Sequence, residues 1–298
     1  TAAIHLALEA LQVPQGSEVI VPDFSMIACA RAVTLAGLEP VFVDCGDDLL
    51  MVPHLFDNNW LPTDVKAIMA VHIYGRQCDM ESVNLIARYN DDMPVIEDLA
   101  EAHGVKPHQS TDAACWSFYR NKIIAGEEGG AVAFKNPDHA ALARQLRSLG
   151  FTDAHDFNHV PRGHNYRMSN VHARLIIDSL GKVGVNLMKR RAAEAEYNAL
   201  CPTEWRMPPR DAPWVYDIKI PGMTADRQTE LVRRLNDAGI AARHAFKPLS
   251  SQPEYREARY VGTRRAYALA REVIYLPLMG AEPQKAFLII LDTVPASD

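Results

Sequence analysis

The sequence lacks several features that would place the chain in a special class of protein. No apolar run approaches the ~18–20 residues of a membrane-spanning helix, and no signal-peptide pattern opens the chain. Internal repeats and low-complexity segments are absent. Basic residues are not in excess, since the net charge is −6, which argues against a broad nucleic-acid-binding surface. We therefore expect neither a membrane nor a nucleic acid as a partner.

Cysteine is scarce and shows no pairing pattern. The five cysteines lie far apart, without a C-x-x-C pair, at Cys29, Cys45, Cys78, Cys115 and Cys201. An odd, scattered set is typical of a reduced cytosolic protein and fits neither a disulfide framework nor a zinc motif. We therefore expect a cytoplasmic location and no bound metal.

Length and composition indicate an ordinary globular protein. The chain has 298 residues, which corresponds to about two domains of ~150 residues each. Hydrophobic residues make up 48% and charged residues 23%, which is typical of folded domains and excludes disordered, collagen-like and coiled-coil chains. A soluble α/β enzyme is the class that we expect.

Short apolar runs alternate with helical patterns in the first half of the chain. The sequence predicts strands at 18–22, 40–44, 67–72, 94–98, 113–118 and 130–134. It predicts helices at 27–37, 82–90 and 136–149, and another from Thr1 to shortly before Pro14. This alternation indicates a mostly parallel sheet covered on both faces. Ligands of such sheets bind at the carboxyl ends of the strands, where the polar residues are Asp23, Ser25, His72, Tyr74, Asp98, Glu101, Ser117 and Lys122.

The second half of the chain has a different organisation. A loop at 150–168, rich in His, Asn, Arg and Gly, precedes a predicted single long helix at 170–200, despite Gly181 and Gly184. A strand at 214–220 and a helix at 224–239, with Thr224 as N-cap, follow a proline-rich boundary. We predict a large α/β domain over 1–185, and a linking helix with a small α+β domain over 186–298.

Two segments carry residues suited to one kind of chemistry. Lys122 lies in an apolar loop between two strands, and shielding a lysine from water favours the neutral amine that forms a Schiff base. Asp98 ends a buried strand, where a carboxylate holds a pyridine nitrogen protonated. The hydroxyl of Ser117 and the helix start at Thr1 and Ala2 suit a phosphate. Together these residues predict a site for pyridoxal 5'-phosphate (PLP).

At these residues the chain resembles the DegT/DnrJ/EryC1/StrS family of PLP-dependent sugar aminotransferases. The matching stretches are 1–8, 18–22, 40–44, 71–75, 96–98, 117–124 and 165–168, in that order. The resemblance implies PLP-dependent transferase fold type I, with a mostly parallel central sheet and a smaller C-terminal α+β domain. Residues 117–124, Glu101 and the Asn-Tyr-Arg-Met loop are most similar to GDP-perosamine synthases, which aminate C4 of a GDP-4-keto-6-deoxyhexose. The expected reaction is amino transfer, from L-glutamate, to a nucleotide-linked keto sugar in polysaccharide biosynthesis.

The resemblance also implies a role for each site residue. Lys122 matches the lysine that bonds to the cofactor and moves protons, and Asp98 matches the carboxylate on the pyridine nitrogen. Glu101 stands near the cofactor's phenolic oxygen, where many members have Gln. The phosphate cradle matches Thr1, Ala2, Ser117 and, from the neighbouring subunit, Asn165. A homodimer is therefore expected.

The chain departs from the family pattern in four places. Met26 stands where an aromatic side chain usually stacks on the cofactor ring, and a thioether packs there more weakly. Glu127 replaces a glycine, and Ser250 replaces a common histidine near the sugar-nucleotide site. Family members also carry a segment ahead of the Thr-Ala motif, which we expect to be missing here. The sugar, its nucleotide, the aminated position and the amino donor stay open on the sequence alone.

Other hypotheses are compatible with parts of the pattern. A catalytically silent member acting as a binding or regulatory protein is one, because Met26 weakens the ring contact. A PLP-dependent sugar dehydratase is disfavoured, since family dehydratases have histidine where Lys122 stands. A non-sugar keto substrate is a further alternative, because Ser250 weakens the nucleotide inference. Glu101 is as readily a solvated glutamate, and we expect His72 and His103 to be structural.

Overall fold

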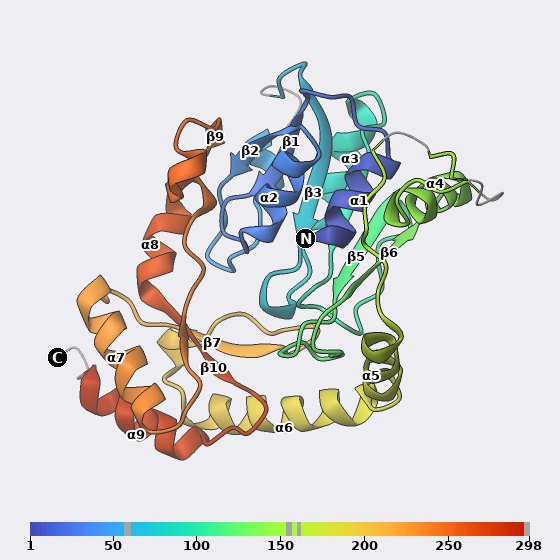
Figure 1. Cartoon of the computed structure of the whole chain (residues 1–298). Helices are drawn as coiled ribbons and strands as arrows, with labels where there is room; N and C mark the ends of the chain where they lie inside the picture. The colour runs from blue at the N-terminus through green and yellow to red at the C-terminus, as the bar shows by residue number, and fades with distance from the viewer. Residues whose placement is uncertain (57–60, 153–156, 160–161, 295–298) are drawn as a thin grey trace.

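The computed structural model describes residues 1–56, 61–152, 157–159 and 162–294. These residues form a large α/β region that contains the N-terminus and a smaller α+β region near the C-terminus (Figure 1). Parts of the predicted 150–168 loop, at 153–156 and 160–161, lie outside the described residues. No helix in the described ranges is both long and apolar enough to cross a bilayer.

The large region is built on a seven-stranded sheet with the strand order β6-β5-β4-β3-β1-β2-β9. Its strands are β1 (Glu18–Pro22), β2 (Glu39–Val43), β3 (Val65–Val71), β4 (Val95–Asp98), β5 (Ala113–Ser117), β6 (Gly130–Phe134) and β9 (Tyr260–Val261). Every neighbouring pair is parallel except β5 and β6, which run antiparallel. The predicted mostly parallel sheet is confirmed. The order of strands reverses between β1 and β3, and this is where such sheets bind ligands.

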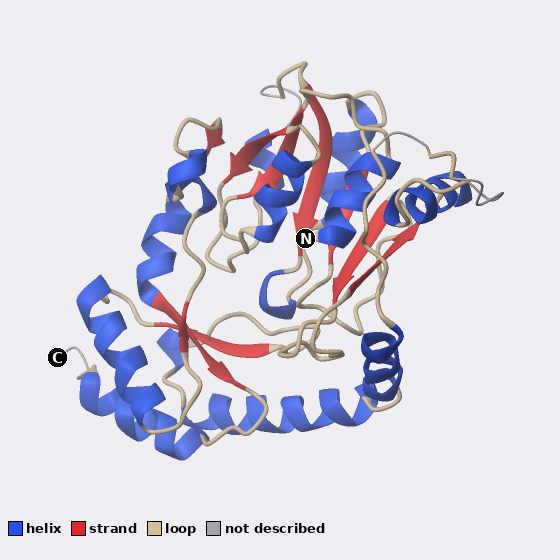
Figure 2. Ribbon diagram, in the orientation of Figure 1, coloured by secondary structure: helices blue, strands red, loops and turns tan. Residues whose placement is uncertain are grey.

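Helices cover both faces of this sheet (Figure 2). They are α1 (Ala2–Ala10), α2 (Ala28–Leu35), α3 (Met80–Tyr89) and α4 (Pro137–Arg147). Val19 and Val21 of β1 pack in the core that includes residues of α1 and α2, whereas Ile20 packs in the core beside α3. Strands that are buried on both faces need a continuous apolar sequence, which is why β1 reads as one apolar run.

The predicted single helix over 170–200 is wrong. The chain forms α5 (Asn170–Leu180) and α6 (Val183–Leu200), with a break at Gly181 and Lys182. Glycine costs about 1 kcal/mol in a helix interior relative to alanine, so Gly181 and Gly184 together weaken the joint. The two pieces also pack on different partners, because α5 lies against Gly126 in the β5–β6 loop and α6 packs on α9 (Pro283–Thr293).

The smaller region has a three-stranded antiparallel sheet of its own. Its strands, in the order β7-β10-β8, are β7 (Val215–Lys219), β10 (Val273–Pro277) and β8 (Arg243–His244). The predicted N-cap is confirmed, because the Thr224 side chain accepts a hydrogen bond from the Arg227 N–H at the start of α7 (Ala225–Asp237). The chain then returns to the large sheet, where β9 pairs with β2, before α8 (Arg265–Glu272) leads into β10.

The two regions meet at a buried ionic cluster. Asp217 of β7 is 0% exposed, and its Oδ1 accepts hydrogen bonds from Arg76 at 2.9 Å and from the Arg210 Nε at 3.0 Å. Next to it, Ala212 passes so close to Gly75 that a Cβ there would lie 1.7 Å from the Ala212 carbonyl oxygen. Gly75 also has a φ of +86°, so only glycine fits this position.

We expect Asp217→Asn to lower the free energy of unfolding by about 3–5 kcal/mol, because Arg76 would stay buried without a countercharge among the described residues and Arg210 would keep only Glu194, at 2.7 Å. Burial alone would raise the pKa of Asp217, but the Arg210 and Arg76 guanidiniums hold it below its ordinary value. This contribution is therefore present at neutral pH and is lost only as the pH falls through the lowered pKa. Urea unfolding at several pH values measures it.

The exposed pair of Arg234 and Asp292 provides the control. A surface ion pair contributes at most about 1 kcal/mol, so Asp292→Asn is expected to shift the unfolding midpoint little. Equal shifts in the two variants would contradict a special role for Asp217.

Candidate active site

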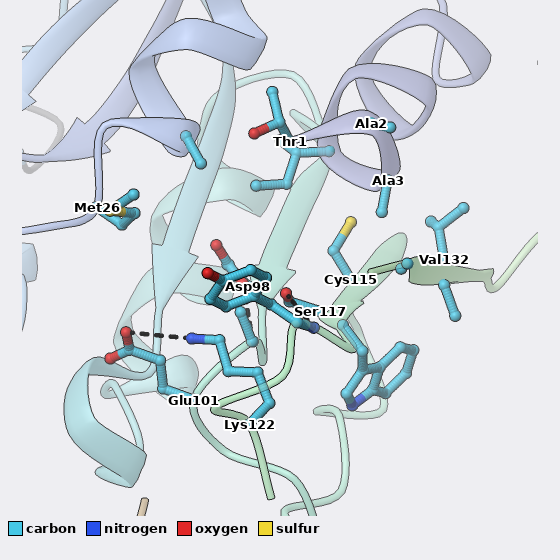
Figure 3. Close-up of a pocket in the computed structure, with 18 of the residues that line it drawn as sticks. Thr1, Ala2, Ala3, Met26, Asp98, Glu101, Cys115, Ser117, Lys122 and Val132 are labelled. Carbon is cyan, nitrogen blue, oxygen red and sulfur yellow. Dashed lines mark hydrogen bonds and ion pairs between the residues drawn. The ribbon is translucent and has the colours of Figure 1, made fainter. Parts of the chain in front are cut away.

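An open cavity of about 1540 Å³ lies at the carboxyl ends of the central strands, beside the start of α1. All the predicted site residues line this cavity: Thr1, Ala2, Met26, Asp98, Glu101, Ser117, Lys122 and Asn165. Figure 3 shows most of them facing one another, with Thr1 and Ala2 above and Lys122 and Glu101 below. The fold therefore brings together residues that lie far apart in the sequence.

Lys122 lies in the loop between β5 and β6, and its side chain is only 11% exposed. Its Nζ is 3.6 Å from Oε1 of Glu101 and 3.9 Å from the ring centroid of Trp214. The aromatic face favours a cation. The Trp214 ring is fixed in turn, because its Nε1 donates to the Asn121 carbonyl at 2.8 Å and its own carbonyl accepts from Arg190. The predicted shielding of Lys122 thus depends on a residue of the smaller region.

Glu101 is buried, with 4% of its surface exposed, so the solvated alternative is wrong. Its Oε2 accepts a hydrogen bond of 2.8 Å from the Tyr74 N–H, and its Oε1 faces Lys122. Burial raises the pKa of Glu101 to about 7, although Lys122 and the Tyr74 N–H act to lower it. The carboxyl group of Glu101 therefore gains or loses its proton near neutral pH.

Asp98 is a buried carboxylate without a cationic partner among the described residues. It is 6% exposed, its Oδ1 accepts from the Ala100 N–H at 2.9 Å, and its Oδ2 accepts from the Cys29 thiol at 3.4 Å. Buried charges in proteins are normally paired. A protonated pyridine nitrogen supplies the missing positive partner, so this residue fits PLP.

The start of α1 forms the phosphate-sized end of the cavity. No side chain caps this helix, and the first N–H groups of a helix have no intrahelical partner, so they are free to bind an anion. Thr1, Ala2 and Ala3 line the cavity at this end, together with Ser117 at the end of β5. A Cβ at Gly130 would lie only 3.0 Å from the Trp116 carbonyl oxygen of β5, and it would be in ordinary contact with the Ala3 side chain at 3.4 Å.

The positions that depart from the family pattern have distinct surroundings. Met26 is 50% exposed at the cavity. Asn165, which matches the family pattern, is exposed as well and lines the cavity of its own chain. Glu127 adopts a φ of +66°, so the loop keeps a conformation that favours glycine. Ser250 donates to Asp23 through its backbone N–H at 2.7 Å and its hydroxyl at 3.0 Å. Burial raises the pKa of Asp23 to about 6, although the two hydrogen bonds from Ser250 act to lower it.

Two strand-end histidines lie outside the cavity lining. His72 is buried and contacts Glu97 through its Nε2 at 2.8 Å, which ties neighbouring strands together behind the site. His103 stacks on Phe118 with 5.9 Å between ring centroids, and burial together with the charge of Lys122 lowers its pKa to about 4. These contacts agree with the structural role expected for both.

Sequence reasoning did not identify three contributors to the site. Trp214 lies far along the chain from Lys122 and gives no local signal. The thiol of Cys29, on α2, donates a hydrogen bond to Asp98, whereas the sequence pattern indicates only a reduced cysteine at this position. Tyr74 was noted as a strand-end residue, but its backbone N–H rather than its side chain binds Glu101. Its φ of +53° is an outlier visible only in the structure.

Comparison with known proteins supports the same interpretation. The profile of the DegT/DnrJ/EryC1/StrS aminotransferase family matches residues 1–286. GDP-perosamine synthase of Caulobacter vibrioides is 32% identical over 268 residues, which is 86% of this chain and 72% of that protein. A putative pyridoxal phosphate-dependent aminotransferase of Bacillus subtilis, EpsN, is 34% identical over 280 residues, 87% of this chain and 71% of that protein.

A solved structure matches the fold closely. The putative sugar aminotransferase Spr1654 from Streptococcus pneumoniae, in its PMP form, superposes with a TM-score of 0.87 at 23% identity and covers 98% of this chain and 83% of its own. The predicted fold type I is confirmed. The chain belongs to the DegT/DnrJ/EryC1/StrS family and is a PLP-dependent aminotransferase.

Proposed function

We propose that this enzyme transfers an amino group from L-glutamate to the keto carbon of a nucleotide-linked sugar, and that the sugar is a GDP-4-keto-6-deoxyhexose. The observation that carries the proposal is one cavity lined by Lys122, by the unpaired carboxylate of Asp98 and by the uncapped start of α1. The choice of sugar is supported by GDP-perosamine synthases among the relatives, at 32% identity. Polysaccharide biosynthesis in the cytoplasm stays a prediction from the sequence.

Each residue has a task that follows from its surroundings. PLP, when bound, supplies an electron-accepting pyridine ring that makes a neighbouring C–H bond acidic. Asp98 would hold a proton on the ring nitrogen, and the N–H groups of α1 with the Ser117 hydroxyl would bind the phosphate. The Nζ of Lys122 would carry the covalent link and, once the donor amine has displaced it, would act as the base that moves a proton between the substrate carbon and the cofactor.

Glu101 is suited to control the protonation of two groups, the amine of Lys122 and the phenolic oxygen of the bound cofactor. A neutral Glu101 would be able to donate a hydrogen bond to the phenolic oxygen of the cofactor, whereas an ionised Glu101 would repel that oxygen and favour the ammonium form of Lys122. Because its pKa is about 7, both forms are populated under ordinary conditions.

The rest of the cavity supports a large, anionic acceptor. A volume of about 1540 Å³ exceeds the 300–1,000 Å³ that is usual for one small ligand. Arg167, Arg243 and His244 line it in addition to the residues above. Arginine is the preferred partner of phosphate oxygens, and a nucleotide sugar carries two phosphates.

We further propose that the enzyme is a homodimer that pairs through α5. No residue of α5 is buried, and it exposes apolar side chains on more than one side, with Val171 71% and Ile177 60% exposed. Exposed apolar side chains gathered on one helix are typical of an interface. Asn165 lies on the segment that leads into α5, so a second copy docked here would place that segment beside the joint between subunits.

The reaction is tested with purified enzyme, PLP, L-glutamate and a panel of GDP-, UDP- and dTDP-linked keto sugars, with mass spectrometry of the products. We expect the amino sugar to form from the GDP substrate and the yellow colour to bleach when glutamate is added. Lys122→Ala is expected to lose the visible absorbance and to slow turnover by at least ~10²–10⁴-fold, because covalent attachment and proton transfer both disappear.

Lys135→Ala, at an exposed position just after β6, is the control and should keep full activity. Undiminished turnover by Lys122→Ala would refute the assignment of the base. Product from UDP- or dTDP-sugars alone would refute the choice of nucleotide. A colourless protein that ignores both PLP and glutamate would favour the catalytically silent alternative.

Glu101→Gln tests the proton control. In the native enzyme we expect kcat/KM to fall as the pH rises through about 7, because the raised pKa of Glu101 places its ionisation there. Glutamine donates a hydrogen bond at every pH, so the variant should keep its activity to higher pH. Glu128→Gln, an exposed carboxyl of the same cavity, should retain the native profile. The proposed role of Glu101 is contradicted if kcat/KM of Glu101→Gln still falls as the pH rises through about 7.

Ile177→Asp tests the dimer. A charge at this exposed apolar position of α5 is expected to convert the protein from dimer to monomer at micromolar concentration, as measured by sedimentation velocity. Leu288→Asp introduces the same charge at a 73% exposed leucine of α9 and should leave the dimer intact. A native protein that sediments as a monomer, or a dimeric Ile177→Asp, would exclude this interface.

A further inference from the structure

Two histidines and a glutamate converge at α1, and none of the three lines the cavity. His5 and Glu9 are one helical turn apart on α1, and His164 approaches them from the segment that precedes α5. One ligand-type atom from each residue lies within 4.8 Å of the others. His5 Nε2 is 3.6 Å from one oxygen of Glu9, and His164 Nε2 is 2.7 Å from the other. The side chains of Glu9 and His164 remain partly accessible, at 11% and 24% exposure.

His5 is an unusual member of this group because its polar edge is unsatisfied. It is 3% exposed, and its Nε2 is buried without a hydrogen-bond partner among the described residues. Its other ring nitrogen, Nδ1, lies 3.1 Å from the hydroxyl of Tyr166. Metal-binding histidines are typically held in this way, with one nitrogen anchored by a polar group so that the other faces the ion.

We infer that His5, Glu9 and His164 form a binding site for a zinc-type divalent transition-metal ion, with water in the open fourth position. Two imidazoles and one carboxylate are a usual zinc donor set. Zinc bonds of ~2.0–2.2 Å in a tetrahedron separate ligand atoms by roughly 3.3–3.6 Å. The three ligand atoms lie within 4.8 Å of one another, so the widest separation has to shorten by up to roughly 1.5 Å when an ion binds, while the 2.7 Å contact between His164 and Glu9 lengthens by less than ~1 Å.

Among the described residues, the side chain of His164 is joined to α1 by its 2.7 Å hydrogen bond to Glu9. An ion would replace this hydrogen bond.

The ion would act as a clamp rather than as a reactant. It would join α1, whose first residues line the cavity, to the segment that carries Asn165 and Arg167 into the same cavity. This segment is otherwise attached to the end of α4 by backbone hydrogen bonds, including those from the His164 N–H to Leu146 and from the Tyr166 N–H to Arg147. The inference does not depend on the proposed substrate.

The test is zinc titration of the tag-free, PLP-loaded protein, followed by desalting and elemental analysis. We expect one zinc per chain, and a higher thermal unfolding midpoint when zinc is added. His164→Ala and Glu9→Gln should each weaken zinc binding at least about 100-fold. Tyr166→Phe, which keeps the ring and removes only the anchoring hydroxyl, should weaken it by ~10–100-fold.

Glu81→Gln and His54→Ala are matched controls. Glu81 pairs with a single histidine, His108, and His54 is exposed, so neither variant should change the zinc content. Cobalt in place of zinc should give visible absorption bands beyond those of PLP, and these should be absent in His164→Ala. Circular dichroism confirms that each variant is folded. The site is excluded if the protein retains no zinc, or if it binds equally well in His164→Ala and Glu9→Gln.

Discussion

The arrangement of the site depends on how one lysine is kept from water. Lys122 faces a carboxylate on one side and an indole ring on another, and these two groups come from different parts of the fold. Glu101 follows β4 of the large sheet, whereas Trp214 precedes β7 of the smaller region. Correct docking of the two regions is therefore a condition for the environment of the reactive amine. The buried Asp217 cluster and the tight passage of Ala212 over Gly75 secure that docking.

The sheet supplies the second condition. Because the strand order reverses between β1 and β3, the connections that leave these two strands lead to opposite sides, and a crevice forms outside their carboxyl ends. Asp98 and Ser117 are the last residues of β4 and β5, so their positions are fixed by the backbone hydrogen bonds of the sheet. Under the proposed function, rigid strands would place the groups that bind the cofactor ring and its phosphate, while a loop would carry the lysine that bonds to the cofactor.

The sequence predicted the parts of this structure that follow from local pattern. The apolar runs gave the strands of the large sheet up to β6, and Thr224 gave the start of α7. The break at Gly181 was not predicted. The cost of a glycine in a helix is small, and whether the helix breaks there depends on what the segments before and after it pack against, which the sequence does not show. Trp214, and the meeting of His5 with His164, could not be predicted, since contacts between residues so distant in the chain depend on the tertiary fold. The elements after residue 240 were also not predicted. The strands β8 and β9 have only two residues each and are too short to give a pattern, whereas α8, β10 and α9 are long enough to be predicted from their periodicity.

The short strand β9 has a consequence for how this enzyme opens and closes. Having entered the smaller region, the chain comes back to the far edge of the large sheet, pairs Tyr260 and Val261 with β2, and leaves again through α8. The two regions are therefore joined by this pairing as well as by the Asp217 cluster. A wide rotation of one region about a single hinge would break the pairing of β9 with β2, so we expect ligands to enter through side-chain and loop rearrangements.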